Sequence, residues 1–94
     1  MKCWGRNNDG QLGIENTTDM GDNTGEMAAL PSINLGTGRT ANAIAAGYNH
    51  TCAILDNSSV KCWGRNNYGQ LGIENTTDMG DNTGEMAALP SINL

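Results

Sequence analysis

The sequence has no Phe, and its 5 Lys and Arg residues are outnumbered by 10 Asp and Glu residues, which leaves a net charge of −5. This shortage of basic side chains argues against a non-specific nucleic-acid binder, because the phosphate backbone attracts Lys and Arg. No apolar run exceeds four residues, so we expect no membrane-spanning segment. A basic start followed by an apolar stretch is also missing, and we expect no secretory signal in this chain.

What the sequence has in abundance is turn-forming residues. It contains 13 Gly and 13 Asn residues, whereas only 16% of its residues are charged. Gly and Asn adopt the backbone conformations that tight turns require, and a disordered tail would carry more charge. The composition therefore predicts an all-β chain of short strands joined by turns, and 94 residues suffice for one ordinary domain.

The chain repeats itself with a period of 59 residues. Residues 2–35 return as residues 61–94, and the sole difference is Asp9 in place of Tyr68. Residues 36–60 occur once, so the chain holds about 1.6 repeats of a unit whose length is typical of solenoids and propellers. Such identity indicates a recently amplified or engineered repeat, and an accidental duplication is the alternative.

The residues between the two copies, with those flanking them, predict four short strands. Three segments alternate apolar and polar residues as half-buried strands do, and the fourth, residues 43–46, is small and apolar throughout. That fourth pattern fits a doubly buried strand or a short helix. Gly and Asn turns separate the segments, which predicts an antiparallel meander of residues 31–35, 43–46, 50–55 and 60–63.

A long polar loop follows the last strand, and one helical turn is predicted near its end. Asn82 is followed three residues later by Glu85, as in a capping box, and residues 86–89 form a short apolar run that Pro90 stops. The first copy carries the same pattern in residues 23–30.

The stretch from Ala45 to Gly72 resembles a known repeat. It reads Ala45-Ala-Gly-Tyr-Asn-His-Thr-Cys-Ala-Ile-Leu55, then Val60-Lys-Cys-Trp-Gly-Arg-Asn-Asn-Tyr-Gly-Gln-Leu-Gly72. This is similar to the regulator-of-chromosome-condensation repeat in its bacterial form, and the resemblance covers essentially the whole chain. It implies a β-propeller built from four-stranded blades. The family's hairpin Gly is replaced here, and we expect Asn57 rather than Ser58 to take any positive-φ conformation.

On this interpretation the chain holds one complete blade and parts of two others. Residues 1–35 would be a partial repeat, residues 31–66 a complete four-stranded blade, and residues 67–94 the long loop and first strand of a following blade. A single blade exposes both faces, so we expect copies to associate head to tail into a ring or a filament. The residues expected at this contact are Cys3, Trp4, Trp63, Ile33, Leu35, Ile92 and Leu94.

The three cysteines divide into one candidate pair and one single thiol. If Leu55 lies opposite Ser59 across the hairpin, Cys52 faces Cys62 within disulfide reach. A disulfide and two buried thiols both stay open at this point. A disulfide would suit an extracellular or cell-surface member of the family, whereas Cys3 has no hairpin partner and is expected to be free or intermolecular.

The best candidate for a ligand site is an acidic loop that occurs twice. Its carboxylate and amide oxygens are the ligands that Ca²⁺ prefers, although their spacing does not match the helix–loop–helix calcium motif. We interpret the loop as a solvent-facing turn with helix caps, and keep a small-ligand or calcium-binding rim as the alternative function. Its candidate ligands are Asp19, Asp22, Asn23, Glu26, Asp78, Asp81, Asn82 and Glu85.

Catalytic chemistry has little support in this sequence. His50 is the only histidine and lies two residues from Cys52, but no third group is recognisable that would orient such a pair. We therefore expect a non-catalytic structural and interaction module with no cofactor. Its expected partner is a second copy of itself, with no nucleic acid and no membrane involved.

Overall fold

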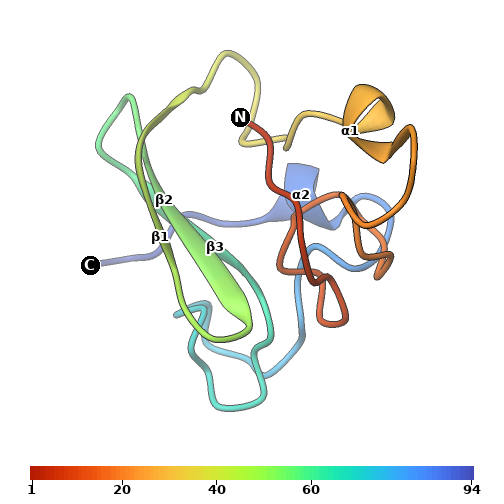
Figure 1. Ribbon diagram of the computed structural model, residues 1–94. Helices are drawn as coiled ribbons and strands as arrows, with labels where there is room; N and C mark the ends of the chain where they lie inside the picture. The colour runs from red at the N-terminus through yellow and green to blue at the C-terminus, as the bar shows by residue number, and fades with distance from the viewer.

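The computed structural model describes residues 1–94 and is built around a three-stranded antiparallel sheet in the order β1–β2–β3 (Figure 1). This confirms the predicted all-β class, although the sheet has three strands rather than the expected four. Two single helical turns lie outside the sheet. The elements are α1 (Glu26–Ala29), β1 (Ala41–Ala46), β2 (His50–Leu55), β3 (Val60–Gly64) and α2 (Glu85–Ala88).

The central strand β2 alternates between buried and more exposed residues, as its sequence predicts, so one face lies in the core and the other does not. Thr51, Ala53 and Leu55 of β2 are buried on one face, and Ile54 on the other face is exposed. β1, by contrast, is exposed along almost its whole length, so the expectation of a doubly buried strand for residues 43–46 is wrong. β1 is an edge strand, and nothing else in this chain covers it.

The turn between β2 and β3 corrects another expectation, because Ser58 rather than Asn57 has a positive φ, of 69°. The Ser58 N–H donates to the Leu55 carbonyl at 3.0 Å. Asp56 and Asn57 are therefore the central residues of an ordinary turn, and the left-handed conformation falls on the third loop residue. Asn57 supports the turn through its side-chain oxygen, which accepts the Ser59 N–H at 3.1 Å.

The expected fourth strand, residues 31–35, does not join this sheet. Its Ile33 N–H donates to the Met1 carbonyl at 2.9 Å, and in the second copy the Ile92 N–H donates to the Val60 carbonyl at 2.8 Å. The segment after each helical turn therefore lies beside the start of the Trp-bearing strand of its own copy. The division of the chain into residues 1–35, 31–66 and 67–94 stays a prediction.

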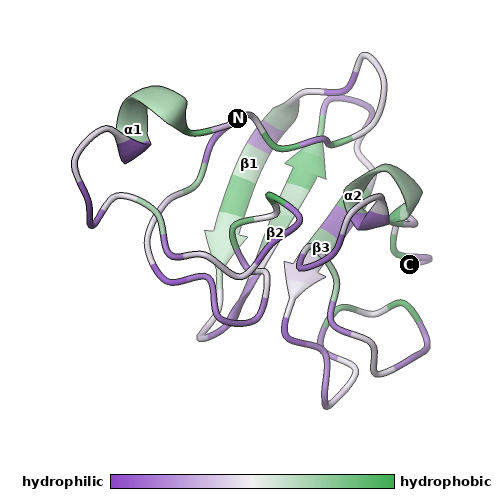
Figure 2. Ribbon diagram, turned by 90° about the vertical axis from the view of Figure 1, so that its right-hand side faces the viewer, coloured by the Kyte–Doolittle hydropathy of each residue, from purple (hydrophilic) through white to green (hydrophobic).

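The core joins the two copies across the sheet. Its members come from residues 31–35 of the first copy, from β2 and β3, and from the second helical turn with the residue that follows it. Figure 2 shows the apolar character of β1 and β2 beside the polar loops around them. Only 20 of the 94 residues are buried, so much apolar surface stays at the outside. The core residues are Ile33, Leu35, Ala53, Leu55, Trp63, Met86 and Leu89.

Outside the sheet, the two copies have the same local structure. Gly5 pairs with Met20 in the first copy, and Gly64 pairs with Met79 in the second. Each helical turn begins at the Glu of its loop, one residue earlier than predicted. Neither is long or apolar enough to cross a bilayer.

Candidate functional site

The two copies differ in what surrounds them, and this difference defines the candidate site. Trp63 is completely buried, whereas its counterpart Trp4 is 62% exposed. Met86 is 1% exposed and its counterpart Met27 is 47% exposed. Because the local sequences are identical, the burial of the second copy comes from the first copy packing against it.

The surface that receives Trp63 is the loop of residues 7–15, here called loop A. The Trp63 indole N–H donates to the Gln11 carbonyl at 3.0 Å, and the Thr51 hydroxyl donates to the same oxygen at 2.9 Å. Gly13 is required beneath the indole, because a Cβ there would lie 2.7 Å from the ring nitrogen. Loop A is therefore shaped to hold one tryptophan.

A second part of the same interface lies between loop A and the region around α2. Figure 1 shows the first loop beside α2, although they are far apart in the sequence. The Glu15 N–H donates to the Gly80 carbonyl at 2.8 Å, and the Met86 N–H donates to Glu15 Oε2 at 3.2 Å. Glu15 holds a left-handed φ of 64°, and these two hydrogen bonds compensate that strain. Gly10 completes the contact, since a Cβ there would lie 2.6 Å from the Asp81 nitrogen.

Each loop is organised by a buried asparagine that the sequence analysis missed. Asn7 donates through Nδ2 to the carbonyls of Asn16 and Thr18 and accepts the Leu12 N–H at 3.0 Å. Asn66 makes the same hydrogen bonds in the second copy, and both side chains are fully buried. The signal was present in the repeated segment Trp-Gly-Arg-Asn, where this Asn follows the tryptophan by three residues.

The residues proposed as calcium ligands serve as hydrogen-bond acceptors for the backbone. Glu26 Oε1 accepts the N–H groups of residues 21–23, and Asp19 accepts a backbone N–H of loop A at 2.8 Å. Glu85 and Asp78 do the same in the second copy. No three His, Cys, Asp or Glu side chains gather closely enough to hold a metal ion. Calcium binding stays a prediction that this geometry does not favour; its other candidates were Asp22, Asn23, Asp81 and Asn82.

Packing against loop A also changes the acid–base chemistry of the second acidic loop. Burial, together with a hydrogen bond to Glu85, raises the pKa of Asp81 to about 6. Burial acts on Glu85 in the same direction, but the hydrogen bonds from Asp81 and from the backbone outweigh it and lower the pKa of Glu85. In the first copy the pKa of Asp22 is raised chiefly by its hydrogen bond to Glu26. The carboxyl pair thus exists in both copies, and only the second is partly buried.

The hairpin has the register that places Cys52 opposite Cys62, and the two form a disulfide. Cys52 is therefore not available as a nucleophile for His50. Cys3 is a free, half-buried thiol, and burial raises its pKa against the opposing effect of the N-terminal charge.

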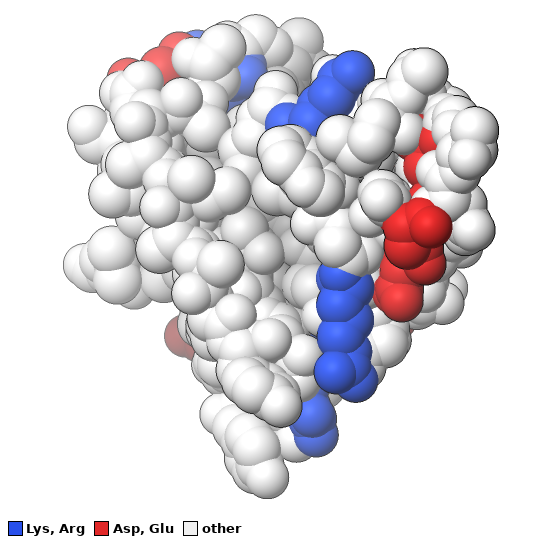
Figure 3. Space-filling model, in the orientation of Figure 1, with Lys and Arg blue, Asp and Glu red and all other residues white.

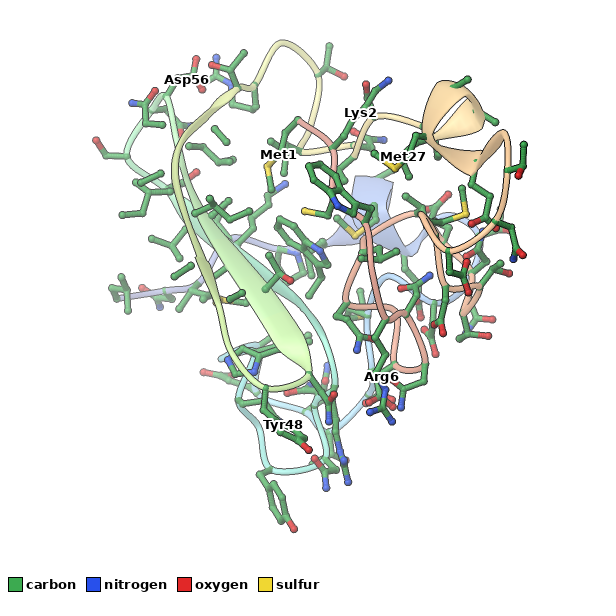
Figure 4. The ribbon with its side chains drawn as sticks, in the orientation of Figure 1. Met1, Lys2, Arg6, Met27, Tyr48 and Asp56 are labelled. Carbon is green, nitrogen blue, oxygen red and sulfur yellow. A yellow bond between two sulfur atoms is a disulfide. The ribbon has the colours of Figure 1, made fainter.

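The residues expected at a contact between copies fall into two groups. Trp63, Ile33 and Leu35 belong to the core of this chain, so their assignment to a contact between chains is corrected to a contact between repeats. Trp4 and Leu94 are exposed, whereas Cys3 and Ile92 are half-buried. Figure 4 shows Met27 near Lys2, beside the N-terminal segment that carries Trp4.

The surface over the sheet is also largely uncharged. In Figure 3 the face over the sheet is almost free of charged side chains, and the charges that are present lie at the hairpin end and on the loops. The side of the sheet opposite the core carries a shallow apolar groove of 280 Å³, lined by residues such as Ala45, Ile54 and Val60. The chain therefore has unpartnered apolar surface on the sheet as well as at Trp4.

Comparison with known proteins gives matches in one family. Residues 3–54, more than half of the chain, match the family described as "Regulator of chromosome condensation (RCC1) repeat", and a second description of the same repeat matches residues 42–70. The Ultraviolet-B receptor UVR8 of Arabidopsis thaliana is 34% identical over 79 residues, which are 83% of this chain and 16% of the receptor. Protein RCC2 of Mus musculus is 40% identical over 76 residues, which are 80% of this chain and 13% of that protein.

A third relative, the X-linked retinitis pigmentosa GTPase regulator of Canis lupus familiaris, is 36% identical over 76 residues, which are 80% of this chain and 7% of that protein. The chain thus spans at most about one sixth of the length of these three relatives.

Proposed function

Because the chain belongs to the regulator of chromosome condensation (RCC1) repeat family, whose repeats are protein-interaction modules of propellers, we propose that it is a non-catalytic module that associates with further copies of itself head to tail. The near-identity of its two copies fits a recently amplified or engineered repeat, in which every copy offers the same two faces.

The observation that carries this proposal is the contrast between Trp63 and Trp4. Within one chain, the first copy buries the tryptophan of the second, while the tryptophan of the first copy stays 62% exposed. A large aromatic side chain held at the surface, here beside the Gly5–Met20 pairing, is typical of interfaces. A second copy of the chain carries the same receiving surface and supplies the partner that Trp4 lacks.

The two faces of such a contact are different, so the contact is heterologous. A heterologous contact yields a ring if the rotation between neighbours closes and a filament if it does not. The exposed edge of β1 is a further place where strands from another chain would pair.

The non-catalytic assignment is supported by the residues themselves. Cys52, the nucleophile considered beside His50, is used in a disulfide. The names of the relatives describe a receptor and a GTPase regulator. We further propose an oxidising compartment such as the cell exterior, because disulfides persist there. Nucleic acid and membranes are not part of the proposal, since the net charge is −5.

The experiment that tests this function is the measurement of the chain's mass in solution by sedimentation velocity, over a series of concentrations with and without reductant. Self-association predicts a mass that rises with concentration in multiples of 9.9 kDa. A mass of one chain at every concentration would overturn the proposal. If the mass falls to one chain only on reduction, the Cys3→Ala chain decides the cause, because reductant also opens the Cys52–Cys62 disulfide: a Cys3→Ala chain that keeps the mass of one chain without reductant would assign the association to a Cys3 disulfide.

A further inference from the structure

We propose that residues 66–74, here called loop B, receive Trp4 of a second copy in the same register in which loop A receives Trp63 within one chain. This inference rests on the proposed self-association and names the surface that carries it. The occupant is a second copy of this chain, because the structure already contains the same contact between two copies of the same sequence.

Loop B has the shape that loop A uses to hold a tryptophan. Gly72 has a φ of 68° where Gly13 has 71°, and a Cβ at either position would meet the Ile of its own copy at 3.2–3.3 Å. Asn66 holds loop B with the same hydrogen bonds that Asn7 makes in loop A. The Gln70 carbonyl, the counterpart of the oxygen that accepts the Trp63 indole, receives no hydrogen bond in this chain.

Trp4 is presented in the way that Trp63 is. Trp4 lies on the segment of the first copy that corresponds to the segment carrying Trp63. This segment is held by the Gly5–Met20 pairing, which repeats the Gly64–Met79 pairing beside Trp63. Its side chain is 62% exposed. Burying this indole against another copy would remove a large apolar surface from water and give its N–H the Gln70 acceptor.

The flanking contacts of loop A also have unused counterparts in loop B. Glu74 holds a left-handed φ of 65°, as Glu15 does, but the two hydrogen bonds of Glu15 have no counterpart at Glu74 within one chain. In the proposed contact, the Glu74 carboxylate accepts the Met27 N–H of the second copy, and the Glu74 N–H donates to the Gly21 carbonyl of that copy. This repeats the two hydrogen bonds of Glu15.

Gly69 provides the most selective place to block the contact. A Cβ on its counterpart Gly10 would lie 2.6 Å from the Asp81 nitrogen, whereas a Cβ on Gly69 meets nothing within 4 Å in one chain. A methyl group at Gly69 therefore meets no atom of the single chain, although its φ of 74° strains any residue with a Cβ, and it collides with Asp22 of a docked second copy.

The one sequence difference between the loops adjoins this contact, since it directly precedes Gly10 in loop A and Gly69 in loop B. Asp9 of loop A is replaced by Tyr68 in loop B. Asp9 is half-buried and its Oδ2 is buried without a hydrogen-bond partner, whereas Tyr68 is exposed. The proposed contact of loop B with a second copy therefore has no unpaired buried carboxylate oxygen at this position. It has instead an aromatic ring of the kind enriched at interfaces.

The test compares three variants of the full chain by sedimentation and by thermal unfolding. Trp4→Ala removes the inserted side chain, and Gly69→Ala blocks the loop. Gly25→Ala is the matched control, because Gly25 also has a positive φ of 86° and open space, and its counterpart Gly84 stays open although its copy is docked. We expect Trp4→Ala and Gly69→Ala to weaken association at least about thirtyfold, as loss of an interface hot spot does, and Gly25→Ala to leave it unchanged.

The outcomes separate this inference from the function on which it rests. If the wild-type chain associates and neither Trp4→Ala nor Gly69→Ala weakens it, the register is wrong while self-association stands, and the β1 edge becomes the contact to examine. If the wild-type chain keeps the mass of one chain throughout, both proposals fail. If Gly25→Ala weakens association as much as Gly69→Ala, backbone strain explains the effect of both glycine substitutions. The effect of Trp4→Ala then decides alone whether loop B receives Trp4.

Discussion

Ser58 holds a left-handed φ of 69° at the third position of its turn, although it has a Cβ that disfavours this conformation. Glycine carries no such penalty, so Ser58→Gly should raise the free energy of unfolding by about 1 kcal/mol. Urea unfolding monitored by tryptophan fluorescence measures this. Ser59→Gly is the control and should destabilise, since it removes the Ser59 hydroxyl that donates to Asn57 Oδ1 at 2.7 Å. Equal effects of the two variants would contradict this account of the turn.

Asn66 illustrates how much one buried polar side chain can hold together. Its Nδ2 donates to three oxygens of Asn75 and Thr77, so Asn66→Asp places a carboxylate oxygen among other acceptors. We expect a loss of at least about 3 kcal/mol of stability, because buried polar groups are left unpaired. Asn67→Asp, at an exposed neighbour, should cost far less. Urea midpoints for both variants test this, and a similar small loss in each would show that loop B does not depend on Asn66.

The carboxyl pair of the second acidic loop should make stability depend on pH. The pKa of Asp81 is raised to about 6 by burial, by its hydrogen bond to Glu85 and by the like charges of Glu85 and Asp78. The folded state therefore binds more protons than the unfolded state between the two pKa values, and stability falls as pH rises from about 4 to 6. Glu85 acts oppositely, since its lowered pKa contributes stability that is lost as pH falls below its usual 4.5.

Asp81→Asn tests this proton balance, because the amide imitates the protonated acid. It should stabilise the chain at pH 7 by about 1 kcal/mol, a value kept small because the pair is largely open to solvent. It should also remove most of the pH dependence near pH 6. Asp22→Asn in the exposed first copy is the control and should change much less. Melting temperatures between pH 4 and 8 provide the measurement, and identical profiles for the wild type and Asp81→Asn would contradict the prediction.

Residue-level errors in the sequence analysis have a common physical cause. Residue preference predicts the positive φ at Asn57 because Asn tolerates it better than Ser, but the turn geometry places the left-handed position one residue later. Likewise, the burial of Asn7 and Asn66 depends on a loop closing around each, which local composition does not reveal. Preferences of single residues are weaker than the hydrogen bonds that the backbone must complete.

At the scale of the element, the β2–β3 hairpin is closed by the Cys52–Cys62 disulfide, with the two residues 10 apart in sequence. A loop of this size predicts a stabilisation of about 3 kcal/mol through the unfolded state. The double variant Cys52→Ala/Cys62→Ala should lose that amount relative to the oxidised chain. Cys3→Ala should lose little, because Cys3 is free and only half-buried. Urea unfolding of the oxidised proteins measures both, and equal losses would show that the disulfide adds nothing beyond thiol packing.

The elements that the sequence predicted well are those whose pattern is local. The alternation of residues 50–55 and 60–63 and the spacing of Asn82 and Glu85 placed β2, β3 and α2 to within a residue, although Gly84 rather than Asn82 is the N-cap of α2. The alternation of segment 31–35 predicts a strand of the sheet, but the segment lies beside Met1. Alternation indicates an extended segment with one buried face, and it does not tell which neighbour the segment pairs with. That choice depends on contacts between residues far apart in the sequence.

At the scale of the whole molecule, the chain contains one completed contact between repeats and the two halves of another. The completed contact buries Trp63 and Met86, and the same residues of the first copy remain open. The sequence predicted that copies would need one another, but it did not distinguish the tryptophan that is buried from the one that is free. The two copies have the same sequence around the tryptophan, so the sequence could not tell which tryptophan is buried. The burial depends only on which copy has another copy packed against it.

A mixing experiment follows from the head-to-tail geometry of the proposed contact. A Trp4→Ala chain keeps a functional loop B, and a Gly69→Ala chain keeps a functional Trp4, so each variant alone lacks one half of the interface. Mixed in equal amounts, they should form one complete contact between unlike chains and stop at a dimer, because the remaining faces are both blocked. Native mass spectrometry with one variant isotopically labelled would show a mixed dimer and no larger species. A contact between two identical faces would instead be damaged in both variants and not restored by mixing, so the absence of the mixed dimer from a mixture of folded variants would exclude the head-to-tail arrangement.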